Sequence, residues 1–185
     1  MPLNVVDLVL LVILAGAFLL GFFQGAIRQL LGLLAWLISF LLAANLRDPV
    51  GDFLGRYWTF FPSGYNQMLA FGLVFIVLFV IVNILTQVRY RRAVIHSRMT
   101  VLDEIIGGLL GALLAVLIVT TAIIVLDSYY ARGGTGGTAD VAWIGQTYRA
   151  LTDSRIAASL HASLIPGLLA ILGPLLPPEV RDVAR

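Results

Sequence analysis

The chain has 185 residues, of which 60% are hydrophobic and 12% are charged, half the ~25% typical of soluble domains. A mean hydropathy of +0.99 excludes an ordinary soluble domain and also a disordered chain, which would be poor in apolar residues and rich in charge. Cysteine is absent, which excludes disulfide frameworks, cysteine–zinc sites, iron–sulfur clusters and thiol catalysis.

Taken in chain order, four uncharged runs are long enough to cross a bilayer as helices, which needs about 20 mostly apolar residues. They lack the two-residue alternation of barrel strands, and no basic residue precedes the first run as it would in a signal peptide. The sequence therefore predicts an all-α, polytopic membrane protein with a transmembrane domain over residues 1–127. We expect its spans at about residues 5–24, 29–46, 68–88 and 103–126.

The arginines predict the orientation of these spans, because short cytoplasmic connections are enriched in basic residues. Arg28 lies between the first two spans, and four arginines follow the third span. If both of these connections are cytoplasmic, both termini are extracytoplasmic. The four arginines after the third span are Arg89, Arg91, Arg92 and Arg98.

Residues 47–67 are expected to form an external loop of about twenty residues with a turn at Pro62. Its aromatic side chains favour an interfacial belt over a ligand cage. These aromatic residues are Tyr57, Trp58, Phe60, Phe61 and Tyr65.

Residues 128–185 are expected to form an extracytoplasmic tail, with a glycine-rich linker followed by amphipathic helices. One helix is predicted to begin at Asp140 and a second after the N-cap residue Ser154, with Pro166 and Gly167 ending the second. The uncharged run over residues 156–178 leaves a fifth span open. Its four prolines favour interfacial or packed helices instead.

Small residues recur every four positions in the first and fourth spans, a pattern that lets transmembrane helices approach closely. Packing within one chain is the simpler interpretation, and self-association is the alternative. The residues of these two stripes are Ala17, Gly21 and Gly25, and Gly107, Gly111 and Ala115.

Three charged residues lie at the ends of spans. Asp7 and Asp103 each open a helix, where an acidic side chain complements the helix dipole and can cap the first turn. Arg28 is expected at the same depth as Asp103, so we hypothesise an ion pair between them. Three polar residues near the inner end of the third span form a patch suited to interhelical hydrogen bonds, or less simply to a water path: Asn83, Thr86 and Gln87.

Enzyme chemistry has little support in the sequence. The two histidines, His96 and His161, are far apart and predicted on opposite sides of the membrane. No metalloprotease, nucleophile-elbow or P-loop motif is present. We therefore expect no catalytic residues, no metal site and no cofactor.

Two segments resemble the CvpA (colicin V production protein) family of bacterial inner-membrane proteins. The first reads GFFQGAIRQL from Gly21 to Leu30, and the second reads LDEIIGGLLG from Leu102 to Gly111; an early acidic residue precedes both. Glu104 departs from the family, whose members often have a basic residue there. The positions that match the family pattern are Asp7, Gly21, Gly25, Arg28, Asp103, Gly107 and Gly111.

The resemblance implies a non-enzymatic protein of the bacterial inner membrane with a role in colicin export and envelope homeostasis. An oligomeric channel or pore is one alternative, and a membrane anchor that presents its external tail to a partner is another. The expected partners are the lipid bilayer, further copies of the chain and an envelope protein bound by the tail. No nucleic-acid partner is expected.

Overall fold

The computed structural model describes residues 4–93, 101–130, 142–177 and 180. Within these residues the chain is helical and contains no strand, so the all-α prediction is confirmed. The elements are α1 (Val5–Gln24), α2 (Ala26–Tyr57), α3 (Ser63–Ala93), α4 (Val101–Tyr130), α5 (Ala142–Thr152), α6 (Arg155–Leu172) and a 3-10 turn η1 (Gly173–Leu175).

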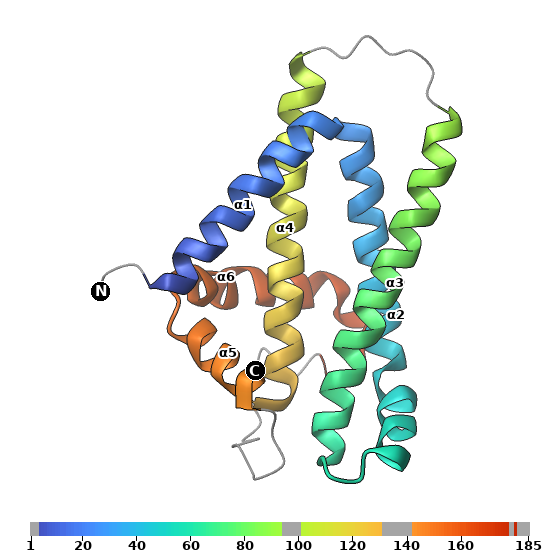
Figure 1. Cartoon of the computed structure of the whole chain (residues 1–185), viewed down its shortest axis with the longest axis vertical. Helices are drawn as coiled ribbons and strands as arrows, with labels where there is room; N and C mark the ends of the chain where they lie inside the picture. The colour runs from blue at the N-terminus through green and yellow to red at the C-terminus, as the bar shows by residue number, and fades with distance from the viewer. Residues whose placement is uncertain (1–3, 94–100, 131–141, 178–179, 181–185) are drawn as a thin grey trace.

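Helices α2, α3 and α4 run upright, α1 is inclined against them, and α6 runs crosswise near the level where α1 begins (Figure 1). α2 packs along α3, and α1 packs along α4. Five helical segments of the described chain are long and apolar enough to cross a membrane, and Arg155–Leu175 is one of them. By length and composition the fifth run qualifies, although it lies across the other helices.

Aromatic side chains fill the centre of the bundle. Trp36 stacks on Phe40 with ring centroids 5.4 Å apart, and Phe40 meets Phe71 at 5.9 Å. The indole N–H of Trp36 donates to the hydroxyl of Thr121 on α4 at 2.9 Å. A buried indole needs such a partner, so this bond fixes how α2 faces α4.

The outer face of α1 is strongly apolar and strongly exposed. Leu8 is 62% exposed, Val12 is 65% exposed and Phe23 is 80% exposed. Such a face is unfavourable in water but suits lipid, which is as apolar as the side chains themselves. The exposed apolar faces therefore agree with helices that span a bilayer.

The predicted external loop is much shorter than expected. α2 continues to Tyr57 and α3 begins at Ser63, so most of residues 47–67 are helical. Pro49 lies inside α2, on an exposed side of the helix. Arg47 and Asp48, taken from the sequence as the start of the loop, are part of the packed helix.

The second correction concerns Pro166 and Gly167, which do not end the last helix. α6 continues through both to Leu172. Pro166 is exposed, and so is Ala162 one turn before it, so the carbonyl left without a donor lies on the open side. On the opposite side Ile165 and Leu169 are buried and hold the helix together. Ser154 is the N-cap, as predicted, and accepts from the N–H of Ala157 at 3.1 Å.

Candidate functional site

The crossing of α1 and α4 brings backbone against backbone. A Cβ atom added to Gly111 would lie 2.5 Å from the carbonyl oxygen of Ala17, and one added to Gly107 would lie 2.5 Å from that of Gly21. The backbone of Gly25, at the end of α1, also lies against the Cβ atom added to Gly107. The structure thus places the small residues of the two stripes together, in a contact that permits no side chain.

The chain reverses direction at Gly25, between α1 and α2. Its φ of 80° and ψ of 165° belong to a region that only glycine adopts without strain. The N–H of Gly25 still bonds to the carbonyl of Gly21 at 2.9 Å. Arg28 consequently lies in the first turn of a new helix and not on a continuation of the α1 stripe.

Asp103, in the first turn of α4, lies against this turn between α1 and α2. Its carboxylate accepts a hydrogen bond from the N–H of Ala26, the first residue of α2, at 3.3 Å. Asp103 therefore caps α2 although it belongs to α4. An acidic side chain at that position also complements the positive end of the α2 dipole. The ion pair with Arg28 stays a prediction.

This bond changes what we expect from a double-mutant cycle on Arg28→Ala and Asp103→Ala. Removing a capping side chain costs ~0.5–2 kcal/mol, and because Asp103 acts on the backbone of Ala26 the loss does not require Arg28. If the ion pair also forms, the two losses in free energy of unfolding are expected to differ from additivity by more than ~0.5 kcal/mol. Equilibrium unfolding in detergent measures them, and additive losses would contradict the ion pair and leave the cap on Ala26 as the role of Asp103.

A cavity of about 280 Å³ opens between α1, α2, α3 and α4 beside this turn. The cavity is open because residues with small side chains line it on α2 and α4, among them Gly32 and Ala115. Phe79 and Ile118 line the cavity as well. Four polar side chains line it: Gln24, Arg28, Gln29 and Asn83.

The polar side chains of the cavity differ in burial and in contacts. Gln29 is 7% exposed, and its amide donates to the side-chain oxygen of Gln24 at 3.2 Å. Arg28 and Asn83 are half-buried. Thr86, which the sequence grouped with Asn83, donates instead to carbonyls of its own helix at 2.9 Å. The side chain of Gln87 lies outside the described residues.

Asp7 forms a second polar junction, between α1 and α6. Its carboxylate accepts from the N–H of Asn4 at 3.0 Å, which completes a capping box at the start of α1. It also accepts from the hydroxyl of Ser154 at 2.6 Å and from the N–H of Ile156 at 3.0 Å. One side chain, 1% exposed, therefore serves the N-termini of two helices.

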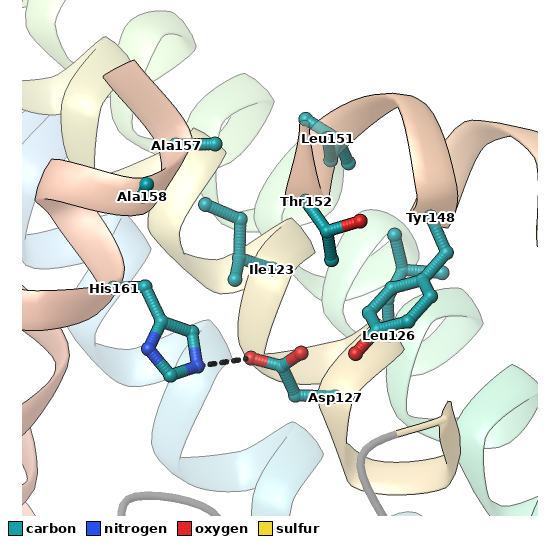
Figure 2. Close-up of a pocket in the computed structure, with 9 residues that line it drawn as sticks. All are labelled: Ile123, Leu126, Asp127, Tyr148, Leu151, Thr152, Ala157, Ala158 and His161. Carbon is teal, nitrogen blue, oxygen red and sulfur yellow. Dashed lines mark ion pairs between the residues drawn. The ribbon is translucent and has the colours of Figure 1, made fainter. Parts of the chain in front are cut away.

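A pocket of about 280 Å³ between α4, α5 and α6 holds a third polar group (Figure 2). A carboxylate oxygen of the buried Asp127 lies 3.1 Å from Nε2 of His161. Tyr148 on α5 turns its hydroxyl toward the same carboxylate. Burial raises the pKa of Tyr148, and so does the neighbouring carboxylate. The phenol therefore stays protonated at neutral pH and is suited to hydrogen bonding.

No local sequence pattern indicates this pocket, because its residues belong to three separate helices. The hydroxyl of Thr152, also in the pocket, donates to the carbonyl of Arg149 at 2.8 Å. The Asp127–His161 pair joins α4 to α6. This ion-pair contact helps to hold the crosswise helix α6 against α4.

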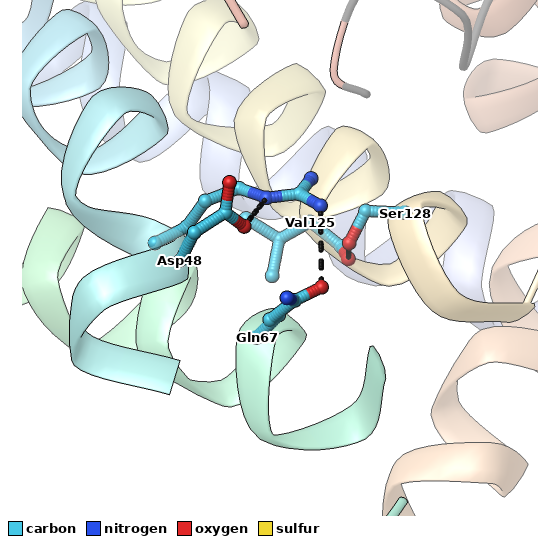
Figure 3. A network of polar contacts seen from close by, with 5 residues as sticks. Asp48, Gln67, Val125 and Ser128 are labelled. Atoms are coloured by element: carbon cyan, nitrogen blue, oxygen red, sulfur yellow. Dashed lines mark hydrogen bonds and ion pairs between the residues drawn. The ribbon is translucent and has the colours of Figure 1, made fainter. Parts of the chain in front are cut away.

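Arg47 makes a fourth polar contact, between α2 and α3. The side chain is 3% exposed. Its Nε lies 3.0 Å from the carboxylate of Asp48, and one terminal nitrogen lies 3.5 Å from the side-chain oxygen of Gln67. Val125 and Ser128 of α4 lie alongside this network (Figure 3). Buried charge is costly unless paired, and the pair with Asp48 supplies that partner within α2.

No group of three or more potential metal ligands occurs among the residues that the structure describes. The contacts of Asp7, Asp103 and Asp127 lie at helix ends and join separate helices, inside a bundle with many exposed apolar side chains. This arrangement, with several helices able to span a bilayer, defines a multi-pass helical membrane protein.

The chain belongs to the Colicin V production protein family, whose model matches residues 6–163. Comparison with curated proteins found no match, and comparison with solved structures found none either. The match begins just before Asp7 and ends within α6. It therefore includes the α1–α4 crossing, the polar cavity and the Asp7 junction.

Proposed function

We propose that this protein acts in colicin export and envelope homeostasis as a non-enzymatic component of the bacterial inner membrane. The observation that carries the proposal is the family match over residues 6–163. The contacts of Asp7, Asp103 and Arg47 support a non-enzymatic role, because each of these side chains is engaged in joining helices.

The proposal is tested in a strain that produces colicin V and lacks the gene for this chain. We expect less colicin in the medium and greater sensitivity to detergent, with both restored by the wild-type chain. Unchanged secretion and unchanged detergent sensitivity would contradict the proposal. A loss of detergent resistance alone would limit the role to the envelope.

The proposed orientation has both termini extracytoplasmic and the arginine-rich connection after α3 cytoplasmic. It is supported by the junction of α1 and α2, which lies at the same end of the bundle as the end of α3 and the start of α4 (Figure 1). Arg28 belongs to the first turn of α2, next to this junction. Cysteines replacing Ser97 and Thr135, two positions outside the described residues, are expected to react with an impermeant reagent from opposite sides. Reaction of both from one side of intact membranes would overturn this orientation.

A further inference from the structure

We propose that the cavity beside Arg28 binds the phosphate group of an anionic phospholipid. Its lining contains one cationic side chain, three amide side chains and no acidic one: Arg28, with Gln24, Gln29 and Asn83. An anion is the ligand that this set of charges and donors favours.

The chemistry of Arg28 suits phosphate in particular. The guanidinium presents five N–H donors in a planar fork that can bond two oxygens of one phosphate. Arg28 lies in the first turn of α2, which begins at Ala26, so the positive end of the helix dipole points to the same place. The amides around it provide further donors.

The remaining walls favour a lipid over a soluble phosphate. Leu20, Phe79, Leu114 and Ile118 line the same cavity as the polar residues. A soluble anion would have no use for these apolar walls, whereas the glycerol and upper acyl chain of a phospholipid would lie against them. The cavity lies among four helices that are long and apolar enough to cross a bilayer, in which lipid would be the surrounding solvent.

Asp103 opposes this binding to a measurable extent. Its carboxylate lies at the N-terminus of α2, bonded to Ala26, and its charge partly cancels the positive potential there. Asparagine keeps an oxygen that can accept from Ala26 but removes the charge. Two substitutions on neighbouring helices are therefore expected to change lipid affinity in opposite directions.

The test uses the full-length chain purified in a neutral detergent, with lipid binding followed by native mass spectrometry and thermal unfolding. Phosphatidylglycerol is expected to bind and to raise the unfolding temperature more than phosphatidylcholine does. Inorganic phosphate at the same concentration distinguishes the two sources of the anion. If it stabilises the chain as well as the anionic lipid does, the lipid assignment is overturned.

Three variants locate the effect. Loss of one charge-assisted bond predicts that Arg28→Gln weakens phosphatidylglycerol binding by about tenfold or more. Asp103→Asn is expected to strengthen it. Arg56→Gln, at the exposed far end of α2, is the matched control and should leave it unchanged. Equal losses for Arg28→Gln and Arg56→Gln would show that surface charge alone attracts the lipid, and would overturn the site.

The wild-type chain provides a test that does not depend on how the variants fold. If phosphatidylglycerol and phosphatidylcholine stabilise the wild-type chain equally, the cavity does not select an anionic lipid, and the proposal is wrong. Arg28→Lys adds a further readout. It keeps the charge but loses the fork, so its affinity should fall between those of the wild-type chain and Arg28→Gln.

Discussion

Replacing Gly111 with alanine is expected to destabilise the protein by ~3 kcal/mol or more, at the upper end of what an overpacked core costs. The added Cβ would meet the carbonyl oxygen of Ala17 at 2.5 Å and the Cα of Gly21 at 3.0 Å. Both are backbone atoms of α1, so no rotamer change relieves the clash and the two helices must separate. Thermal unfolding in detergent measures the loss. The larger Gly111→Leu should abolish folding or assembly, visible as lost expression or altered size on gel filtration.

Gly16 provides the matched control, because it lies in the same α1 helix that Gly111 contacts. A Cβ added to Gly16 meets nothing within 4 Å. Gly16→Ala should therefore be neutral or stabilising by up to ~1 kcal/mol through helix propensity. If Gly111→Ala and Gly16→Ala unfold at the same temperature, the close packing of α1 on α4 is wrong.

Much of the fold follows from the sequence because the bilayer imposes simple rules. A spanning helix needs an uncharged run of a set length, and close helix approach needs small residues every fourth position. The run before Gly25 and the stripe through Gly107 and Gly111 satisfy these rules. The helical class of the described residues agrees with what the sequence predicts.

The helix ends could not be predicted in the same way, because tertiary contacts decide them. Proline is a strong stop signal in isolation, yet Pro49 and Pro166 both lie inside helices on exposed sides. The charge of Arg47 predicts a loop residue, whereas the structure places it inside α2. Its contact with Gln67 on α3 depends on how two helices pack, which no local pattern records.

The polar sites depend on contacts between distant parts of the chain. Ser154 lies 147 positions after Asp7, and their meeting requires the N-terminus of α6 to lie against the start of α1. The sequence does indicate that Asp7 caps the start of α1 and that Ser154 caps α6. It does not indicate that one carboxylate joins both helix ends.

Removing this carboxylate is the second change with a large expected effect. Asp7→Ala leaves the N–H groups of Asn4 and Ile156 and the hydroxyl of Ser154 without their acceptor. A buried polar group without a partner costs ~1–3 kcal/mol, and the two helix dipoles also lose a compensating charge. We expect a total loss of ~3–5 kcal/mol in the free energy of unfolding. Thermal unfolding in detergent measures this loss.

The loss should be local before it is global, since Asp7 holds the N-terminus of α6 against α1. Trypsin cleavage after the exposed Arg155 is therefore expected to accelerate in Asp7→Ala at temperatures where the bundle is still folded. Asp52→Ala, an exposed acidic residue of α2, is the control and should change neither cleavage nor stability. Ser154→Ala removes one of the three bonds to Asp7 and the N-cap bond from Ala157, and should have a smaller effect, ~0.5–2 kcal/mol. If Asp7→Ala is cleaved at the wild-type rate, α6 is held by its apolar side alone, through contacts such as those of Ile165 and Leu169.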